Sequence, residues 1–122
     1  MRLGHPTIPH LWILVTDPHP ESQKAVIVNV TTLRSYSDQT VILRKGEHPY
    51  ILHDSVVSYQ DAQEFSVVKI QDQIDKGWPQ CHSCSHELLK RVQAGILASR
   101  FTKKAIKAIC QQAWAAKAKP SE

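Results

Sequence analysis

The stretch that decides the fold is Lys24-Ala-Val-Ile-Val-Asn-Val-Thr-Thr32, a run dominated by β-branched side chains. Such residues favour strands, where their stiff side chains pack well on a pleated surface. Successive side chains of a strand point to opposite faces, so Val28 and Val30 are expected to face the core. Asn29 and Thr31 would then share the outer face. The segment therefore predicts a strand that presents an amide and a hydroxyl side by side.

Other strand-like runs lie on both sides of this segment. His10–Thr16 precedes it, and the proline-rich stretch Asp17–Gln23 between them is typical of a turn. The candidates that follow are Gln39–Arg44, Tyr50–His53, Ser55–Tyr59 and Ala62–Ile70. Roughly five or six short strands with short connections favour a closed or nearly closed small antiparallel barrel.

The pattern changes after Gln71, and the hydrophobic period becomes helical beyond the break at Asp75–Pro79. One apolar stripe comprises Leu88, Leu89, Val92, Ile96 and Leu97, and a second comprises Phe101, Ala105, Ile106, Ile109, Ala113 and Trp114. Ser85 is a suitable N-cap for the first helix. Amphipathic helices of this length are not stable alone in water, so we expect them to dock on the barrel. The sequence thus predicts one compact domain, mainly β with α, with a β-barrel body over 1–75 and a basic two-helix tail over 76–122.

The charge of the chain is unevenly distributed. The 122 residues carry a formal charge of +4, but residues 1–84 hold seven Lys/Arg against nine Asp/Glu, and residues 85–122 hold eight against two. Lys103, Lys104 and Lys107 lie largely off the apolar stripe, which predicts a surface that attracts nucleic acid or an acidic protein. A solvated helix face that only aids solubility is the alternative.

Membrane, secretion and cofactor signals are absent from the sequence. No apolar run approaches the roughly 18–20 residues that span a bilayer, and the first residues do not resemble a signal peptide. The odd count of three cysteines favours reduced thiols, so we expect a cytoplasmic protein. Cys81 and Cys84 supply only half of a tetrahedral zinc site, and Cys110 is expected inside a helix facing the core. We therefore expect neither a metal nor a cofactor.

Several polar side chains near the strand ends have the chemistry that metal-free RNA cleavage needs. Such a reaction requires a base, an acid and a donor that stabilises the charged phosphorane. His48 and His53 suit proton transfer, with Asp38 as a partner, and Arg34 suits the phosphate. Asp17 and Lys45 are alternatives for the carboxylate and the cation. A structural role for either histidine is the competing interpretation.

The order of these features resembles a known family. Leu11–Thr16, Val26–Thr32 and Gly46–Tyr59 are similar to the core of MazF/PemK-like toxins, and the resemblance covers roughly residues 8–70. Those proteins are small SH3-like barrels of bacterial toxin–antitoxin systems, usually homodimeric endoribonucleases. The last stretch also resembles a family of small uncharacterised bacterial and phage-borne proteins. The resemblance implies an SH3-like barrel, RNA or a cognate antitoxin-like protein as partner, and a possible homodimer.

The site residues carry over from the toxins only in part. Thr31 would correspond to the threonine near the scissile phosphate. The arginine of the family's Arg-Pro step is missing, because this neighbourhood reads Thr7-Ile-Pro-His10. His10 would substitute there as a cation or an acid, but imidazole lacks the fixed charge and the fork of guanidinium.

Three functional hypotheses follow. The first is a metal-independent endoribonuclease that uses His48 or His53 and binds phosphate through Asn29, Thr31, Arg34 and His10. The second is a non-catalytic SH3-like barrel module that binds a protein partner or nucleic acid. The third is a structural protein that oligomerises through its apolar helix faces.

Overall fold

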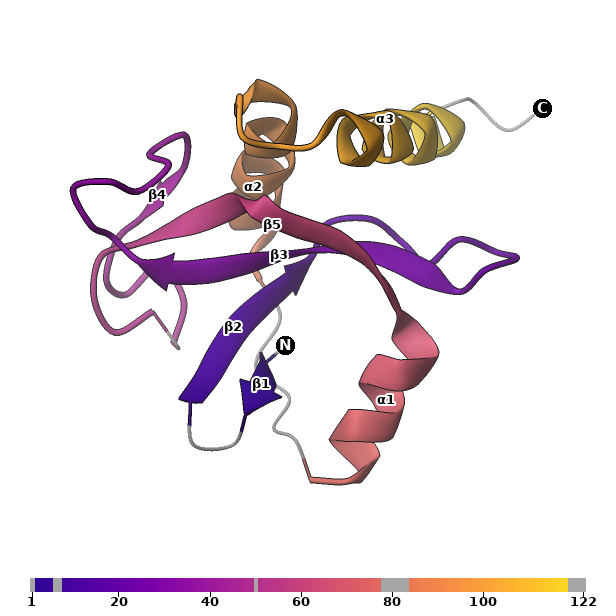
Figure 1. The fold of residues 1–122 in the computed structure, drawn as a ribbon, viewed down its shortest axis with the longest axis horizontal. Coiled ribbons are helices and arrows are strands. Elements are labelled where there is room, and N and C mark those ends of the chain that lie inside the picture. The colour runs from indigo at the N-terminus through magenta and orange to yellow at the C-terminus, as the bar shows by residue number, and fades with distance from the viewer. Residues whose placement is uncertain (1, 6–7, 50, 78–83, 119–122) are drawn as a thin grey trace.

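A computed structural model describes residues 2–5, 8–49, 51–77 and 84–118 (Figure 1). For residues 2–5, 8–10 and 117–118 it describes only the backbone. The strands are β1 (Arg2–His5), β2 (Ile8–Leu14), β3 (Lys24–Thr32), β4 (Ile42–Leu43) and β5 (Ser55–Ser66), and the helices are α1 (Val67–Asp75), α2 (His86–Ala98) and α3 (Lys104–Ala118). They form one antiparallel sheet of order β1-β2-β3-β5-β4. Among the described residues this sheet is open, with β1 and β4 as its edges, so the predicted barrel closure is not observed.

β3 is the central strand and spans the segment predicted from the sequence. Val26, Val28 and Val30 belong to the main hydrophobic core, as the alternation predicts. The opposite face is not uniformly polar, because Ile27 is also buried and packs with Ile70 of α1 in a second cluster. The outer face of β3 is therefore apolar near α1 and becomes polar only at Asn29 and beyond.

β5 replaces two of the predicted strands. Its pairing with β3 jumps from Ile27 opposite Gln63 to Asn29 opposite Ser58, so residues 59–62 bulge opposite the single residue Val28. The prediction for Ala62–Ile70 is wrong in its second half, because the strand ends at Ser66. The Ser66 side chain accepts a hydrogen bond from the Lys69 backbone amide and caps α1. An N-cap overrode the β propensity of the valines that follow it.

Two further strand predictions are corrected. Gln39–Arg44 contributes only the two-residue β4, and residues 51–53 form a loop, Tyr50 lying outside the described residues. The loop is held by backbone bonds from Gly46 N to Ile51 O (3.1 Å) and from Ile51 N to His48 O (2.9 Å). Because these backbone N–H and C=O groups are hydrogen-bonded within the loop, they are not available to pair with a neighbouring strand.

The two C-terminal helices pack on the main core, while α1 lies on the other side of the sheet (Figure 1). α2 buries Leu88, Val92 and Ile96, and Ser85 caps it as predicted by accepting from Leu88 N at 3.1 Å. α3 buries Ile106 and Cys110, and burial raises the pKa of the Cys110 thiol to about 11.

Three members of the predicted stripes do not face the core. Leu97, Phe101 and Ala105 are exposed. Phe101 precedes α3, which begins at Lys104, so the helical period does not apply to it. Among the helices that the structure describes, none is long and apolar enough to cross a membrane.

Candidate nucleic-acid interface

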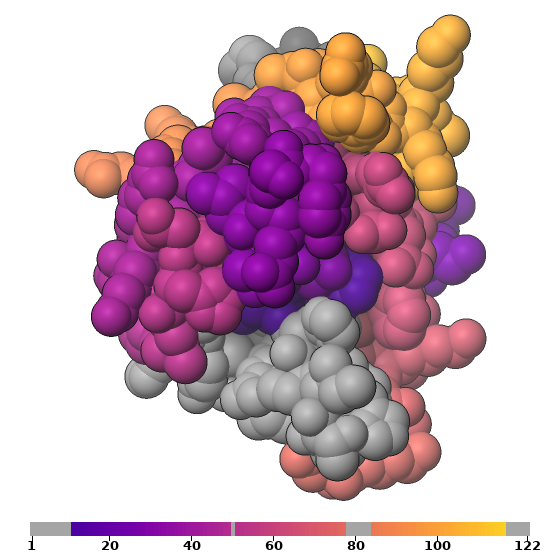
Figure 2. Space-filling model, turned by 60° about the vertical axis from the view of Figure 1, so that its left-hand side comes forward, coloured from indigo at the N-terminus to yellow at the C-terminus, as the bar shows by residue number. Residues whose placement is uncertain are grey.

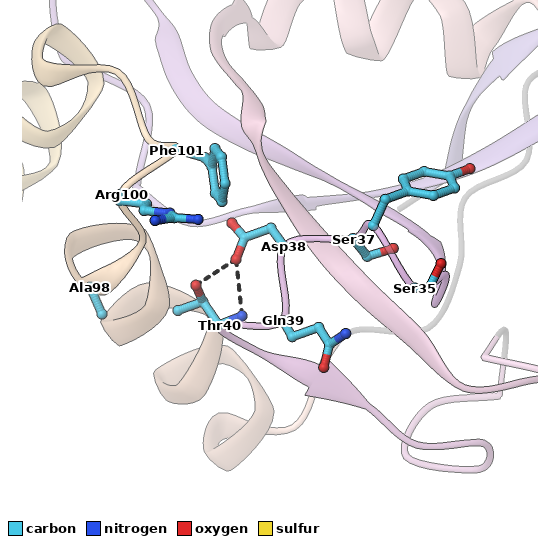
Figure 3. Close-up of a pocket in the computed structure, with 9 residues that line it drawn as sticks. Ser35, Ser37, Asp38, Gln39, Thr40, Ala98, Arg100 and Phe101 are labelled. Carbon is cyan, nitrogen blue, oxygen red and sulfur yellow. Dashed lines mark hydrogen bonds between the residues drawn. The ribbon is translucent and has the colours of Figure 1, made fainter.

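A hollow of about 430 Å³ opens between the loop after β3 and the connection from α2 to α3 (Figure 3). We call it the loop hollow. Its lining residues are Ser35, Tyr36, Ser37, Asp38, Gln39, Thr40, Ala98, Arg100 and Phe101. Figure 2 shows the purple part of the chain that contains this loop meeting the orange atoms of the α2–α3 region. Segments some sixty residues apart in sequence therefore build one surface.

Asp38 fixes the shape of the loop. Its Oδ1 accepts from the Thr40 backbone amide at 3.0 Å and from Thr40 Oγ1 at 2.5 Å, and its Oδ2 accepts from Ser99 Oγ at 2.6 Å. Partial burial acts to raise the pKa of Asp38, but the hydrogen bonds from Ser99 and Thr40, with the charge of Arg100, outweigh it and hold that pKa below the ordinary value. The carboxylate therefore stays ionised at neutral pH and ties the loop to the end of α2.

A tight turn carries an aromatic ring outward at the start of the loop. Arg34 N donates to Ser37 Oγ at 2.9 Å, and Ser37 N donates to Arg34 O at 3.1 Å. Tyr36 at the tip of this turn is 85% exposed. A large aromatic side chain so free of packing has its ring available to a ligand.

A second aromatic ring and a cation stand on the opposite wall. Phe101 is 43% exposed, and the Arg100 guanidinium carbon lies 4.9 Å from the centre of its ring. The Phe101 amide donates to Ser99 Oγ at 3.1 Å, so the same serine anchors both walls. In Figure 3 the Arg100 guanidinium and the Phe101 ring lie beside the Asp38 carboxylate. Aromatic faces beside fixed positive charge suit bases and phosphates of single-stranded nucleic acid.

The predicted catalytic residues occupy different environments. His48 is only 4% exposed, within the 44–51 turn. His53 is exposed, and its Nε2 lies 2.8 Å from Thr32 Oγ1. Asp38 binds Ser99 and Thr40 at the loop hollow instead of a histidine. The arrangement favours a structural role for His48 and a loop-shaping role for Asp38.

The alternative partners named from the sequence are engaged locally. The Lys45 backbone amide donates to Asp54 Oδ1 at 3.1 Å, and Arg44 Nη1 lies 3.0 Å from Asp54 Oδ2. The pKa of Asp54 is lowered first by the Lys45 amide and then by Arg44. Asp17 is exposed in the turn before β3. The loop that contains Arg44, Lys45 and Asp54 thus has its own charge network.

The predicted binding residues divide between two places. Arg34 is exposed beside the loop hollow, and Thr31 is exposed on β3. Asn29 shares a face with Thr31 but lies at the β5 bulge, in a second hollow that Lys103 also lines. Lys104 is exposed and Lys107 half-buried on α3. The side chain of His10 lies outside the described residues.

Three residues that line the loop hollow were not singled out from the sequence. Tyr36 had one available signal, which is its place as a lone aromatic residue among serines in Arg34–Asp38. Phe101 was assigned to an apolar stripe, and Arg100 was counted only within the basic tail. Phe101 was placed in the stripe of the second helix, whereas α3 begins only at Lys104.

In the part of the chain that the structure describes, no group of three or more His, Cys, Asp or Glu side chains is arranged to hold an ion. Cys81 lies outside the described residues, so the expectation that Cys81 and Cys84 hold no metal stays a prediction.

No family model, curated protein or solved structure matches the chain.

Proposed function

We propose that this protein binds single-stranded RNA, and that the loop hollow is the contact surface. The observation that carries the proposal is the pair of exposed aromatic rings, Tyr36 and Phe101, that line one hollow together with Arg100. Proteins that bind single strands use exposed aromatic rings as stacking platforms, and two such rings line this one hollow.

The charge around the hollow supports a polyanionic ligand. Arg34 and Arg100 flank the aromatic rings, and Lys103 and Lys104 follow directly at the start of α3. Asp38 is the one carboxylate among the described lining residues, and its negative charge offsets that of Arg100 within the lining. The excess positive charge that would attract phosphates therefore comes from Arg34, Lys103 and Lys104 next to the lining residues.

The size and polarity of the hollow favour bases that are not paired. A duplex keeps its bases stacked inside, whereas a single strand presents base faces and edges to a protein. The hydroxyls of Ser35 and Ser37 and the amide of Gln39 line the hollow and offer hydrogen bonds to base edges. Stacking and edge contacts are thus both available in one place.

Salt dependence tests this proposal. A labelled RNA of about eight nucleotides is titrated with the protein by fluorescence anisotropy over a series of salt concentrations. Affinity is expected to fall steeply with salt, and Arg100→Gln is expected to weaken binding and to lower the slope by about 0.7. Lys90→Gln, an exposed cation of α2 that does not line the hollow, is the matched control. Salt-independent binding, or equal behaviour of the two variants, would contradict the proposal.

We also propose kinship with the SH3-like barrels of MazF/PemK-like toxins. The central position of β3 between β2 and β5 is compatible with it, and the resemblance of Leu11–Thr16 and Val26–Thr32 to that family's core motivates it. The proposal concerns binding rather than cleavage, because the family arginine is missing and His48 is buried. A cognate antitoxin-like protein would be the second partner, and co-purification of the neighbouring gene product would test for it.

A further inference from the structure

A second hollow, of about 380 Å³, lies at the bulge of β5, and we call it the strand hollow. Its lining residues are Trp12, Asn29, Gln60, Asp61, Ala62, Gln63 and Lys103. Trp12, Asn29 and Ser58 stand opposite one another on β2, β3 and β5. The bulge then carries residues 60–63 past this row, which creates the depression.

Asn29 and Asp61 bring polar groups together there. Directly opposed side chains of neighbouring antiparallel strands lie roughly 5 Å apart, so Ser58 is beside Asn29. Ser58 Oγ donates to Asp61 Oδ2 at 2.7 Å, which places the Asp61 carboxylate close to the Asn29 amide. Asn29 Oδ1 is buried and has no hydrogen-bond partner among the described residues. The terminal torsion of asparagine is two-fold, so a half-turn presents either end of the amide to the hollow.

The chemistry of this lining matches a nucleotide. Trp12 offers an aromatic wall for a base, and the amides of Asn29, Gln60 and Gln63 have donors and acceptors that can hydrogen-bond with base edges. Lys103 provides a cation for a phosphate. The ionised Asp61 carboxylate has only hydrogen-bond acceptors. It therefore favours a base edge that carries donor hydrogens, and it repels a base carbonyl oxygen in the same place.

Both hollows are lined by residues of the short connection between α2 and α3. Arg100 and Phe101 line the loop hollow, and Lys103 lines the strand hollow. Phe101 and Lys103 are two residues apart, so their backbones are separated by at most about 7 Å. One nucleic acid strand that occupies the loop hollow thus has the strand hollow within its reach.

We infer that the strand hollow holds a further nucleotide of the same RNA strand, and that it favours a base with an exocyclic amino group over uracil. This inference rests on the proposed function. The amino group would donate to Asp61 and to the Asn29 amide, the base would stack on Trp12, and Lys103 would contact a phosphate. The loop hollow would contribute stacking, and the strand hollow would contribute base preference.

Oligocytidine and oligouridine of about eight nucleotides form the matched probes, since their bases differ where cytosine carries an amino group and uracil an oxygen. The expected result is tighter binding of oligocytidine, with Asp61→Asn reducing that preference about tenfold. Glu64→Gln, an exposed carboxylate of the same strand outside the hollow, should leave the preference unchanged. Thermal unfolding confirms that each variant is folded.

Length dependence gives a second readout. Lys103→Gln should weaken the longer oligomer by several-fold and lower its salt slope by about 0.7, while the control Lys90→Gln, an exposed cation outside the hollow, should leave both unchanged. A dinucleotide is too short to fill both hollows and is expected to occupy the loop hollow, so the Lys103→Gln and Lys90→Gln proteins should bind it alike. If Asp61→Asn and Lys103→Gln behave like their control variants while Arg100→Gln still weakens binding, the inference about the strand hollow is overturned. The proposed RNA binding at the loop hollow is not overturned by that result. If no oligomer binds the unaltered protein, the proposed function is overturned with it.

Discussion

Replacing both Tyr36 and Phe101 with alanine is expected to weaken the binding of single-stranded RNA by at least about thirtyfold. Stacking of a base on an aromatic side chain contributes roughly 1–3 kcal/mol, so two lost rings correspond to about 2–6 kcal/mol. Each 1.4 kcal/mol is about tenfold in affinity, which sets the lower bound. Fluorescence anisotropy with a labelled RNA of about eight nucleotides measures the change.

The double alanine variant is expected to stay folded because both rings are exposed. Because Tyr36 is 85% and Phe101 43% exposed, their removal should change the free energy of unfolding by only about 0.5 kcal/mol for each ring. Leu52 and Val68 are exposed apolar residues far from the loop hollow in sequence and outside its lining, so the Leu52→Ala and Val68→Ala double variant is the control. Unchanged RNA affinity in the aromatic variant, or an equal loss in the control, would show that the rings do not form the contact surface.

Substituting Gly95 with alanine is expected to destabilise the fold by about 3 kcal/mol. A Cβ at this position would lie 2.1 Å from Tyr59 Oη and 2.5 Å from Val41 Cγ2, well inside van der Waals contact. Tyr59 has no room to withdraw, because it is fully buried and its hydroxyl donates to Val92 O at 2.8 Å. Alanine gains about 1 kcal/mol of helix propensity over glycine, which is too small to offset the clash. Urea denaturation measures the loss.

Two further variants locate the cause of that loss. Leu97→Ala alters an exposed residue of the same helix and should change stability by less than about 0.5 kcal/mol. Tyr59→Phe in the Gly95→Ala background removes the nearest clashing atom and should recover part of the stability, although the ring carbon at 2.7 Å still clashes. A Gly95→Ala protein as stable as the original would mean that α2 does not approach the sheet this closely.

The central strand was predictable because its signal is local. The β-branched residues of Lys24–Thr32 favour an extended chain whatever surrounds them, and the alternation places Val28 and Val30 in the core. Helix α2 was predictable for the same reason, since its apolar period and the Ser85 cap lie within one segment. These features need no knowledge of distant residues.

The errors arose where a distant residue or a cap decides the structure. Val67 and Val68 favour a strand by propensity, but Ser66 caps a helix at that point. The bulge in β5 depends on its register with β3, which no local pattern records. Phe101 fits the helical period of the sequence, but it lies in the connection between α2 and α3, where its ring is exposed to solvent.

The candidate site was only partly predictable for the same physical reason. Asn29 was found because strand alternation places it on the outer face, and Lys103 because of the charge asymmetry. Their convergence in one hollow depends on how the start of α3 lies against β5. The loop hollow depends on the bond between Ser99 and Asp38, which links residues 61 positions apart.

Ultraviolet crosslinking of a bound RNA oligomer, followed by mass spectrometry of the peptides, tests the RNA-binding surface most directly. The crosslinked residues are expected to be Tyr36 and Phe101, with Trp12 added when the oligomer is long enough to reach the bulge of β5. Crosslinks confined to α1, or a bound RNA that reacts with none of these three rings, would contradict the account.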